Sequence, residues 1–237
     1  MIMNKQSNTY TILYIIVLVL VVGSALALTA MALKPRQQEN ADADKKRQIL
    51  AAVHITAEQK EISSAFDKYI TDQFIVNEAG EHIGQDAFAV NVANESKIAA
   101  DKRQLPVYVC TLLDNGETKY ILPVYGAGLW GPIWGYVALD SDGSTVYGAY
   151  FAHQGETPGL GAEIEKPAFS DQFEGKQMFK GDRYLPVTVV KAGQKPLGDE
   201  DYVDAVSGGT ITSKGVAAML SDCLSPYKNY LETLRNK

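Results

Sequence analysis

The sequence has few of the residues from which metal sites and disulfide frameworks are built. Its 237 residues include two cysteines and three histidines, namely Cys110, Cys223, His54, His82 and His153. They form no CxxC pair and no His-rich ligand spacing, so we expect no protein-bound metal. Both cysteines lie in apolar surroundings typical of buried thiols. A disulfide stays open, because it requires two Cα atoms within about 7 Å of each other.

Signatures of hydrolysis and of nucleic-acid binding are also missing. No GxSxG sequence occurs, and the histidines lack the spacing of a catalytic triad, so no catalytic residue is expected. The formal net charge is −6 at pH 7, which disfavours contact with a phosphate backbone. We therefore expect no nucleic acid partner.

One long apolar run occupies the N-terminal part of the chain. Residues 10–33 contain no charged side chain, and the run exceeds the roughly 20 residues that a helix needs to cross a bilayer. A signal peptide has a shorter apolar core of roughly 7 to 15 residues, so a retained transmembrane helix is favoured over a cleaved leader. The expected order is a tail over 1–9, this helix over 10–33, a juxtamembrane helical stalk over 34–70 and a folded domain over 71–237.

The stalk is predicted to contain two helices. Ile49, Leu50 and Val53 have the spacing of an amphipathic helix that leaves the membrane, and Thr56 is a plausible N-cap for a second helix over 57–70. Charge alone places the folded domain in the cytoplasm by the positive-inside rule. One basic residue precedes the apolar run and five follow it closely: Lys5, then Lys34, Arg36, Lys45, Lys46 and Arg47.

The middle of the chain alternates β-rich runs with turns. Asn115-Gly116 and Asp142-Gly143 each separate two such runs, which predicts two hairpins and an antiparallel sheet. Residues 166–177 look helical, and 184–193 look like a strand. A closing helix is expected from Thr212 or Ser213, with an interruption at Pro226. The fold class is therefore α+β, with helices flanking the sheet.

Three stretches have unusual composition. Residues 204–216 gather hydroxyl side chains around Gly208 and Gly209, which suits either a phosphate at a helix N-terminus or a simple helix cap made by Ser213. Residues 153–164 form a glycine-rich loop that a flat ligand can approach closely, or an ordinary connection. Trp130 and Trp134 either fill the core or border a ligand.

Taken together, the segments GLWGPIWGYVALD, GETPGLGAEI and DAVSGGTITS resemble the NqrC family of the Na+-translocating NADH:quinone oxidoreductase. They follow the family's order after a single N-terminal span, and the resemblance covers nearly the whole chain. The corresponding flavin-carrying subunit of the related Rnf complex shares the last motif and the FMN-binding domain. The resemblance implies that residues 71–237 are an extracytoplasmic FMN-binding domain.

In that family a flavin transferase joins FMN through a phosphodiester to the last threonine of an Asp-x-x-Ser/Thr-Gly-Ala-Thr motif. The resemblance therefore implies covalent FMN on Thr210. The preceding motif positions map to Asp204, Ser207, Gly208 and Gly209, and Gly209 replaces the usual alanine. Thr212 and the first amides of the last helix are expected to hold the phosphate. The flavin ring is expected to lie among Leu129, Trp130, Glu156, Thr157, Gly159, Leu160 and Gly161.

The resemblance further implies an electron-transfer subunit that is not catalytic alone. It implies as partners the other subunits of the complex, the flavin transferase during maturation and the membrane. It places the chain in the bacterial inner membrane, single-pass, with the soluble domain periplasmic, against the charge count. The alternatives are the Rnf subunit, a non-catalytic anchored binding domain and a free-standing extracytoplasmic flavin reductase.

Overall fold

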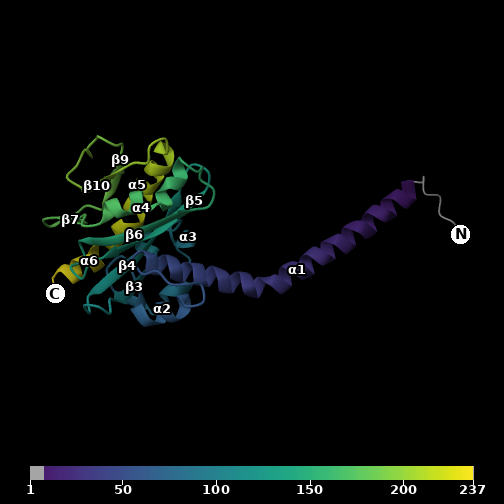
Figure 1. Cartoon of the computed structure of the whole chain (residues 1–237), viewed down its shortest axis with the longest axis horizontal. Helices are drawn as coiled ribbons and strands as arrows, with labels where there is room; N and C mark the ends of the chain where they lie inside the picture. Colours follow the sequence, from purple (N-terminus) through teal and green to yellow (C-terminus); the bar gives the residue numbers. More distant parts are fainter. Residues whose placement is uncertain (1–7, 237) are drawn as a thin grey trace. The chain divides into compact units, whose positions relative to one another are not determined.

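The computed structural model of the chain describes residues 8–236 (Figure 1). The described residues form two compact units, which divide between Lys45 and Lys46. Helix α1 (Asn8–Ala51) contains the whole predicted span and continues through Pro35. Within the described residues it is the one helix that is long and apolar enough to cross a membrane. The predicted tail over 1–9 lies outside the described residues except for Asn8 and Thr9, which are already helical.

The predicted boundary between stalk and domain, at residue 70, is wrong. Ile49, Leu50 and Val53 are at most 1% exposed and belong to a core cluster of the second unit, which begins at Lys46. Their apolar spacing reflects packing inside the domain, since an amphipathic face is stabilised when another apolar surface covers it. The second helix, α2 (Ile62–Tyr69), also begins later than predicted, after Glu61 rather than after Thr56.

The second unit is built on a six-stranded antiparallel sheet in the order β2-β1-β3-β4-β5-β6. Its strands are β1 (Ile70–Val76), β2 (His82–Gly84), β3 (Leu105–Thr111), β4 (Thr118–Ala127), β5 (Pro132–Leu139) and β6 (Val146–His153). Both predicted hairpins are confirmed, and Gly116 and Gly143 supply the positive φ angles of 73° and 65° in their turns. A further tight turn, residues 128–131, joins β4 to β5 and carries Leu129 and Trp130.

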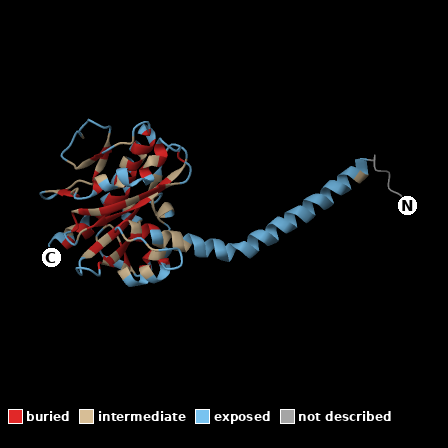
Figure 2. Cartoon of the chain, in the orientation of Figure 1, coloured by how far each residue is buried: buried red, intermediate tan, exposed pale blue. Residues whose placement is uncertain are grey.

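Both faces of the sheet are buried, as Figure 2 shows by the red along its strands. Val124 and Val137 point into the larger cluster, which includes α5, whereas Ile121 and Tyr136 point into the cluster beneath the end of α1 and α2. The two cysteines belong to different clusters, and both are free. The open question of a disulfide is thus answered: the sheet separates the two thiols.

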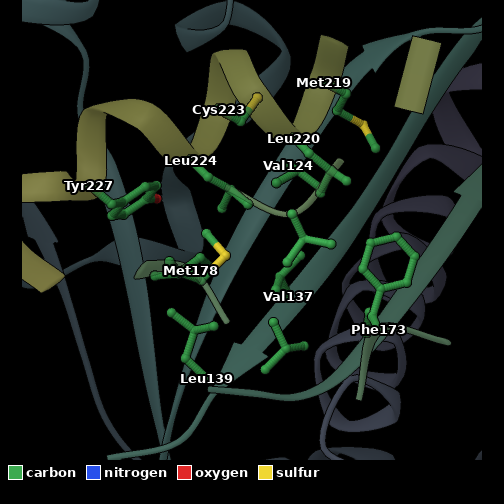
Figure 3. Packing of buried hydrophobic residues seen from close by; sticks show 14 of the residues in the cluster. Val124, Val137, Leu139, Phe173, Met178, Met219, Leu220, Cys223, Leu224 and Tyr227 are labelled. Carbon is green, nitrogen blue, oxygen red and sulfur yellow. The ribbon is translucent and has the colours of Figure 1, made fainter. Parts of the chain in front are cut away.

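The C-terminal helices cover the larger cluster. They are α5 (Thr210–Leu224), the 3-10 helix η5 (Ser225–Tyr227) and α6 (Lys228–Arg235), so the predicted interruption at Pro226 is confirmed. Figure 3 shows Met219, Leu220 and Leu224 of α5 directed at the sheet, near Val124 and Val137. This packing places the start of α5 beside the end of β4.

The remaining elements are short. They are η1 (Ala87–Ala89), α3 (Val92–Glu95), η2 (Ala100–Lys102), η3 (Gly161–Glu165), α4 (Pro167–Ser170), η4 (Asp171–Phe173), β7 (Phe179–Lys180), β8 (Arg183–Tyr184), β9 (Thr188–Val190) and β10 (Tyr202–Asp204). The predicted helix over 166–177 is only α4 and η4, because Phe169 and Phe173 anchor the segment in the core and Gly175 then turns with φ 73°. The strand predicted over 184–193 shortens to β9, which pairs in parallel with β10. The α+β class with flanking helices is confirmed.

Candidate functional site

The hydroxyl-rich segment connects β10 to α5. Asp204 ends β10 with its side chain exposed, and its backbone N–H donates to Gln172 Oε1 at 2.8 Å. Ser207 and Gly208 are also exposed, and Gly208 has a φ of 75° that favours glycine. Gly209 N then donates to Val206 O at 3.1 Å, which closes the turn immediately before the helix.

Helix α5 begins at Thr210, earlier than the predicted start at Thr212 or Ser213. The residue before it is Gly209, which provides no side-chain cap. The prediction that Ser213 caps the helix is wrong, because its Oγ accepts a hydrogen bond from Val206 N at 3.1 Å and so holds the loop. Thr210 is exposed at the first helical position, so a large ligand can reach its hydroxyl.

Gly209 occupies a restricted position. It is buried, and a Cβ atom built on it lies 3.1 Å from Val206 Cγ1 and 3.2 Å from Leu160 O. Both distances are shorter than ordinary van der Waals contact. The glycine therefore lets the loop that carries Leu160 approach the turn before Thr210 more closely than an alanine does.

The carboxylate of Glu156 lies where three chain segments meet. It is 5% exposed and accepts hydrogen bonds from Thr212 Oγ1 at 2.6 Å and from Trp130 N at 2.8 Å. The amide of Leu129 is a further donor. Burial disfavours ionisation, but the hydrogen bonds from Thr212, Trp130 and Leu129 outweigh it and hold the pKa of Glu156 below its usual range.

Two glycines make room for this carboxylate. A Cβ atom on Gly128 overlaps Glu156 Oε1, and one on Gly161 overlaps Glu156 Oε2 and Thr212 Oγ1. Gly161, which the resemblance places beside the flavin ring, is buried and is not on the surface. The hydroxyl of Thr212, which is 2% exposed, is committed to Glu156. The backbone amide of Thr212 lies in the first turn of α5, where a helix offers no carbonyl acceptor of its own.

Four large apolar side chains are exposed around this junction. Leu129, Trp130, Leu160 and Ile211 are 47%, 67%, 43% and 57% exposed. Leu160 contacts the turn before α5, since a Cβ atom on Gly208 lies 2.5 Å from Leu160 Cδ2. Trp130 therefore does not fill the core. Clustered exposed apolar side chains of this kind mark a binding surface.

The other tryptophan and the glycine-rich loop have structural roles. Trp134 is partly buried, and its Nε1 donates to Gln48 Oε1 at 3.0 Å. Thr157 and Gly159 are exposed on the loop surface, where Gly159 adopts a φ of 76° and donates its N–H to Glu163 Oε1 at 3.0 Å. Of the predicted loop residues, Leu160 thus presents the largest apolar surface.

A cavity beside Thr210 was not expected from the sequence. It has a volume of 520 Å³, and its lining includes Ser207, Gly208, Thr210 and the cations Lys191, Lys195 and Lys214. Lys214 follows Thr210 by four residues, so helical spacing alone indicates that the two share a face of α5. The two lysines from the loop after β9 are distant in sequence, and only the fold brings them near Thr210.

Acidification is expected to destabilise the junction at Glu156. Because its folded pKa lies below the value of about 4.3 for a free glutamate, the folded state binds fewer protons than the unfolded state. Its contribution to stability is complete above about pH 4.3 and is lost as pH falls through the folded pKa. Melting temperatures of the full chain from about pH 7 to about pH 3 test this. Glu156→Gln should show a shallower acid decline, and equal declines would contradict the linkage.

Comparison with known proteins relates the chain to FMN-binding domains and to subunits of an NADH-quinone reductase. The FMN-binding domain family matches residues 128–225. The NqrC subunit of the Na(+)-translocating NADH-quinone reductase of Vibrio vulnificus is 36% identical over 195 residues, which cover 76% of each chain. The same subunit of Neisseria meningitidis is 32% identical over 196 residues, covering 76% of this chain and 75% of the relative.

Solved structures show the same similarity. The crystal structure of the corresponding Na(+)-translocating NADH-quinone reductase subunit from Parabacteroides distasonis matches with a TM-score of 0.78 and 47% identity, over 84% of this chain and 96% of that chain. The crystal structure of Shewanella oneidensis NqrC matches with a TM-score of 0.68 and 26% identity, over 84% and 100%. Every residue discussed from Leu129 to Lys214 lies within the region that the FMN-binding domain family matches.

Proposed function

The chain belongs to the NqrC family of Na(+)-translocating NADH-quinone reductase subunits, and we propose that it transfers electrons through FMN bound covalently to Thr210. It is accordingly a subunit of an oxidoreductase complex, and the other subunits of that complex are its partners. The chain itself contains an FMN-binding domain. This membership favours the quinone reductase over the Rnf complex. It also disfavours a free-standing flavin reductase.

The position of Thr210 carries the proposal. Its hydroxyl is exposed at the first residue of a helix of fifteen residues, next to a 520 Å³ cavity and within the FMN-binding region. In the phosphodiester, Thr210 Oγ1 gives up its proton and bonds to the phosphorus of the flavin phosphate. The flavin transferase supplies the flavin phosphate as an ester that also carries a leaving group. The phosphorus–oxygen bond to that leaving group breaks as the bond to Thr210 forms, the leaving group departs with the electron pair, and a base on the transferase takes up the threonine proton.

The surroundings of Thr210 suit the negative charge of a phosphodiester. The amides of Thr210, Ile211 and Thr212 lie in the first turn of α5, where a helix offers no carbonyl acceptor of its own. The helix dipole adds partial positive charge at this end. Lys214 on the next turn and Lys191 across the cavity supply cations.

The apolar side chains suit the ring. We place the isoalloxazine against Leu129, Trp130 and Leu160, which are exposed and border the turn before α5. Bound FMN supplies reversible electron uptake and release. The protein binds and orients the ring, excludes water from one of its faces and adjusts the potential with nearby charge. A covalent bond also prevents loss of the cofactor between turnovers.

Family membership also bears on the position of the chain in the cell. We propose that α1 anchors the chain in the bacterial inner membrane as a single span and that the FMN-binding domain is periplasmic, where a flavin transferase modifies Thr210. Helix α1 is long and apolar enough for this role. Because Cys110 and Cys223 are both buried, the test uses a cysteine introduced at the exposed Asp182. Labelling of that cysteine by a membrane-impermeant thiol reagent only in inside-out vesicles would overturn the orientation.

Intact mass with and without a flavin transferase tests the proposal. The full chain is expected to gain the mass of one FMN residue only with the transferase present, and to fluoresce in a denaturing gel. Peptide mapping should place the added mass on Thr210. A colourless chain of unchanged mass, with the transferase active on a control protein, would instead indicate a non-catalytic anchored binding domain.

A further inference from the structure

The buried position of Glu156 is unexpected for a residue that only contacts a surface ligand. Its side chain is among the few buried polar ones in residues 8–236, whereas Leu129 and Trp130 on the neighbouring turn are exposed. One carboxylate oxygen accepts from Trp130 N, and the other accepts from Thr212 Oγ1. The same group therefore ties the β4–β5 turn to the first turn of α5.

These two elements carry the two parts of the proposed flavin site. The turn presents the side chains of Leu129 and Trp130, which are 47% and 67% exposed. The helix presents Thr210, the proposed attachment point, two residues before Thr212. If Glu156 did not link the β4–β5 turn to α5, a flavin ring attached to Thr210 would keep the rotational freedom of its ribityl chain. The ring would then spend less time in contact with Trp130.

We propose that Glu156 is the positioning residue of the flavin site, which holds Trp130 and Thr210 at a set separation and keeps a negative charge beneath the bound ring. This inference rests on the proposed function. The family resemblance predicts that Glu156 contacts the ring directly. The positioning role proposed here is a different one.

The packing around Glu156 supports a dedicated carboxylate. Both Gly128 and Gly161 are needed in its immediate surroundings, because a Cβ atom on either one overlaps a carboxylate oxygen. The loop that carries Glu156 is also held locally at the end of β6, since Glu156 N donates to His153 Nδ1 at 3.0 Å. The donors from Thr212 and Trp130 favour the ionised form. A buried charge in surroundings of low dielectric acts strongly on a neighbouring redox group.

Two substitutions separate geometry from charge. In Glu156→Gln, the amide oxygen can still accept from Trp130 and Leu129 while the amide nitrogen faces Thr212 Oγ1, so the tie largely remains and the charge is lost. In Glu156→Ala, both the tie and the charge are lost. Asp182→Asn, an exposed carboxylate between β7 and β8, is a matched control for charge removal.

The experiment uses the full chain in detergent after co-expression with the transferase. Covalent flavin is quantified by intact mass, and the folded protein is examined by flavin anisotropy, flavin fluorescence and redox titration. Asp182→Asn should incorporate flavin at the wild-type level, and the readings of the Glu156 variants are taken per covalently bound flavin. Glu156→Gln should shift the midpoint potential to a more positive value with unchanged anisotropy, because an anion no longer opposes reduction. Glu156→Ala should show the same shift, lower anisotropy and several-fold brighter flavin, since the ring leaves the quenching Trp130.

Two results would overturn the inference while leaving the proposed function intact. One is wild-type potential and anisotropy in both Glu156 variants with normal covalent flavin. The other is a potential shift of equal size in Asp182→Asn, which would show a general charge effect. If Glu156→Ala fails to fold, the potential of Glu156→Gln still decides the question. Absence of covalent flavin from the wild-type chain would instead remove the proposed function itself.

Discussion

Thr210→Val is expected to abolish covalent flavin on the chain completely. Valine has nearly the shape of threonine but lacks the hydroxyl oxygen that forms the phosphodiester. Because Thr210 is exposed at the start of α5, the exchange should leave the fold and its melting temperature nearly unchanged. Intact mass after co-expression with the transferase measures the effect, together with flavin fluorescence in a denaturing gel.

Neighbouring hydroxyls serve as controls for this loss. Thr212→Val and Ser213→Ala remove hydroxyls that are committed inside the protein, to Glu156 and to Val206 N respectively. Both variants should retain covalent flavin at the wild-type level when folded. Full covalent flavin in Thr210→Val would refute the attachment site, and mapping of the modified peptide would then locate the true one.

Gly215→Ala is expected to destabilise the domain, although alanine is the better helix former. Within α5, alanine is favoured over glycine by about 1 kcal/mol in helix propensity. However, a Cβ atom on Gly215 overlaps the carbonyl oxygen of Ala127, which ends β4. Backbone cannot rotate away as a side chain does, so the overpacking cost of about 1 to 3 kcal/mol or more should exceed the gain.

With a cost of about 2 kcal/mol and a gain of about 1 kcal/mol, the net loss should be about 1 kcal/mol, which lowers the melting temperature by roughly 2 to 4 °C for a domain of this size. Tryptophan fluorescence follows unfolding, because Trp134 is partly buried against Gln48. Gly155→Ala is the matched control, since a Cβ atom there meets only open space. An unchanged or raised melting temperature in Gly215→Ala would show that α5 can shift away from β4 without cost.

Local signals account for the parts of the fold that sequence predicted well. The Asn115-Gly116 and Asp142-Gly143 turns need positive φ angles, and glycine supplies them whatever the surroundings. The interruption at Pro226 follows likewise from the missing N–H of proline. Such features depend on a few consecutive residues, so they are readable without tertiary contacts.

Long-range packing accounts for the errors. Ile49, Leu50 and Val53 have the spacing of an amphipathic helix. That spacing does not distinguish an apolar face that lies on a membrane surface from one that packs against a sheet. Here the face packs against the sheet, and the predicted stalk becomes part of the core. Serine is a common helix-capping residue, yet in the fold the Ser213 hydroxyl accepts a hydrogen bond from Val206 N.

For the candidate site, the sequence by itself supplied the family resemblance, the glycines around Thr210 and, through that resemblance, the prediction that Thr210 is the attachment point. Only the tertiary structure decided that the Glu156 side chain is buried and that Leu129, Trp130, Leu160 and Ile211 remain exposed. The physical reason is that burial and hydrogen bonding depend on segments brought together from far apart. Glu156 and Thr212 are separated by 56 positions in sequence but by 2.6 Å in the fold.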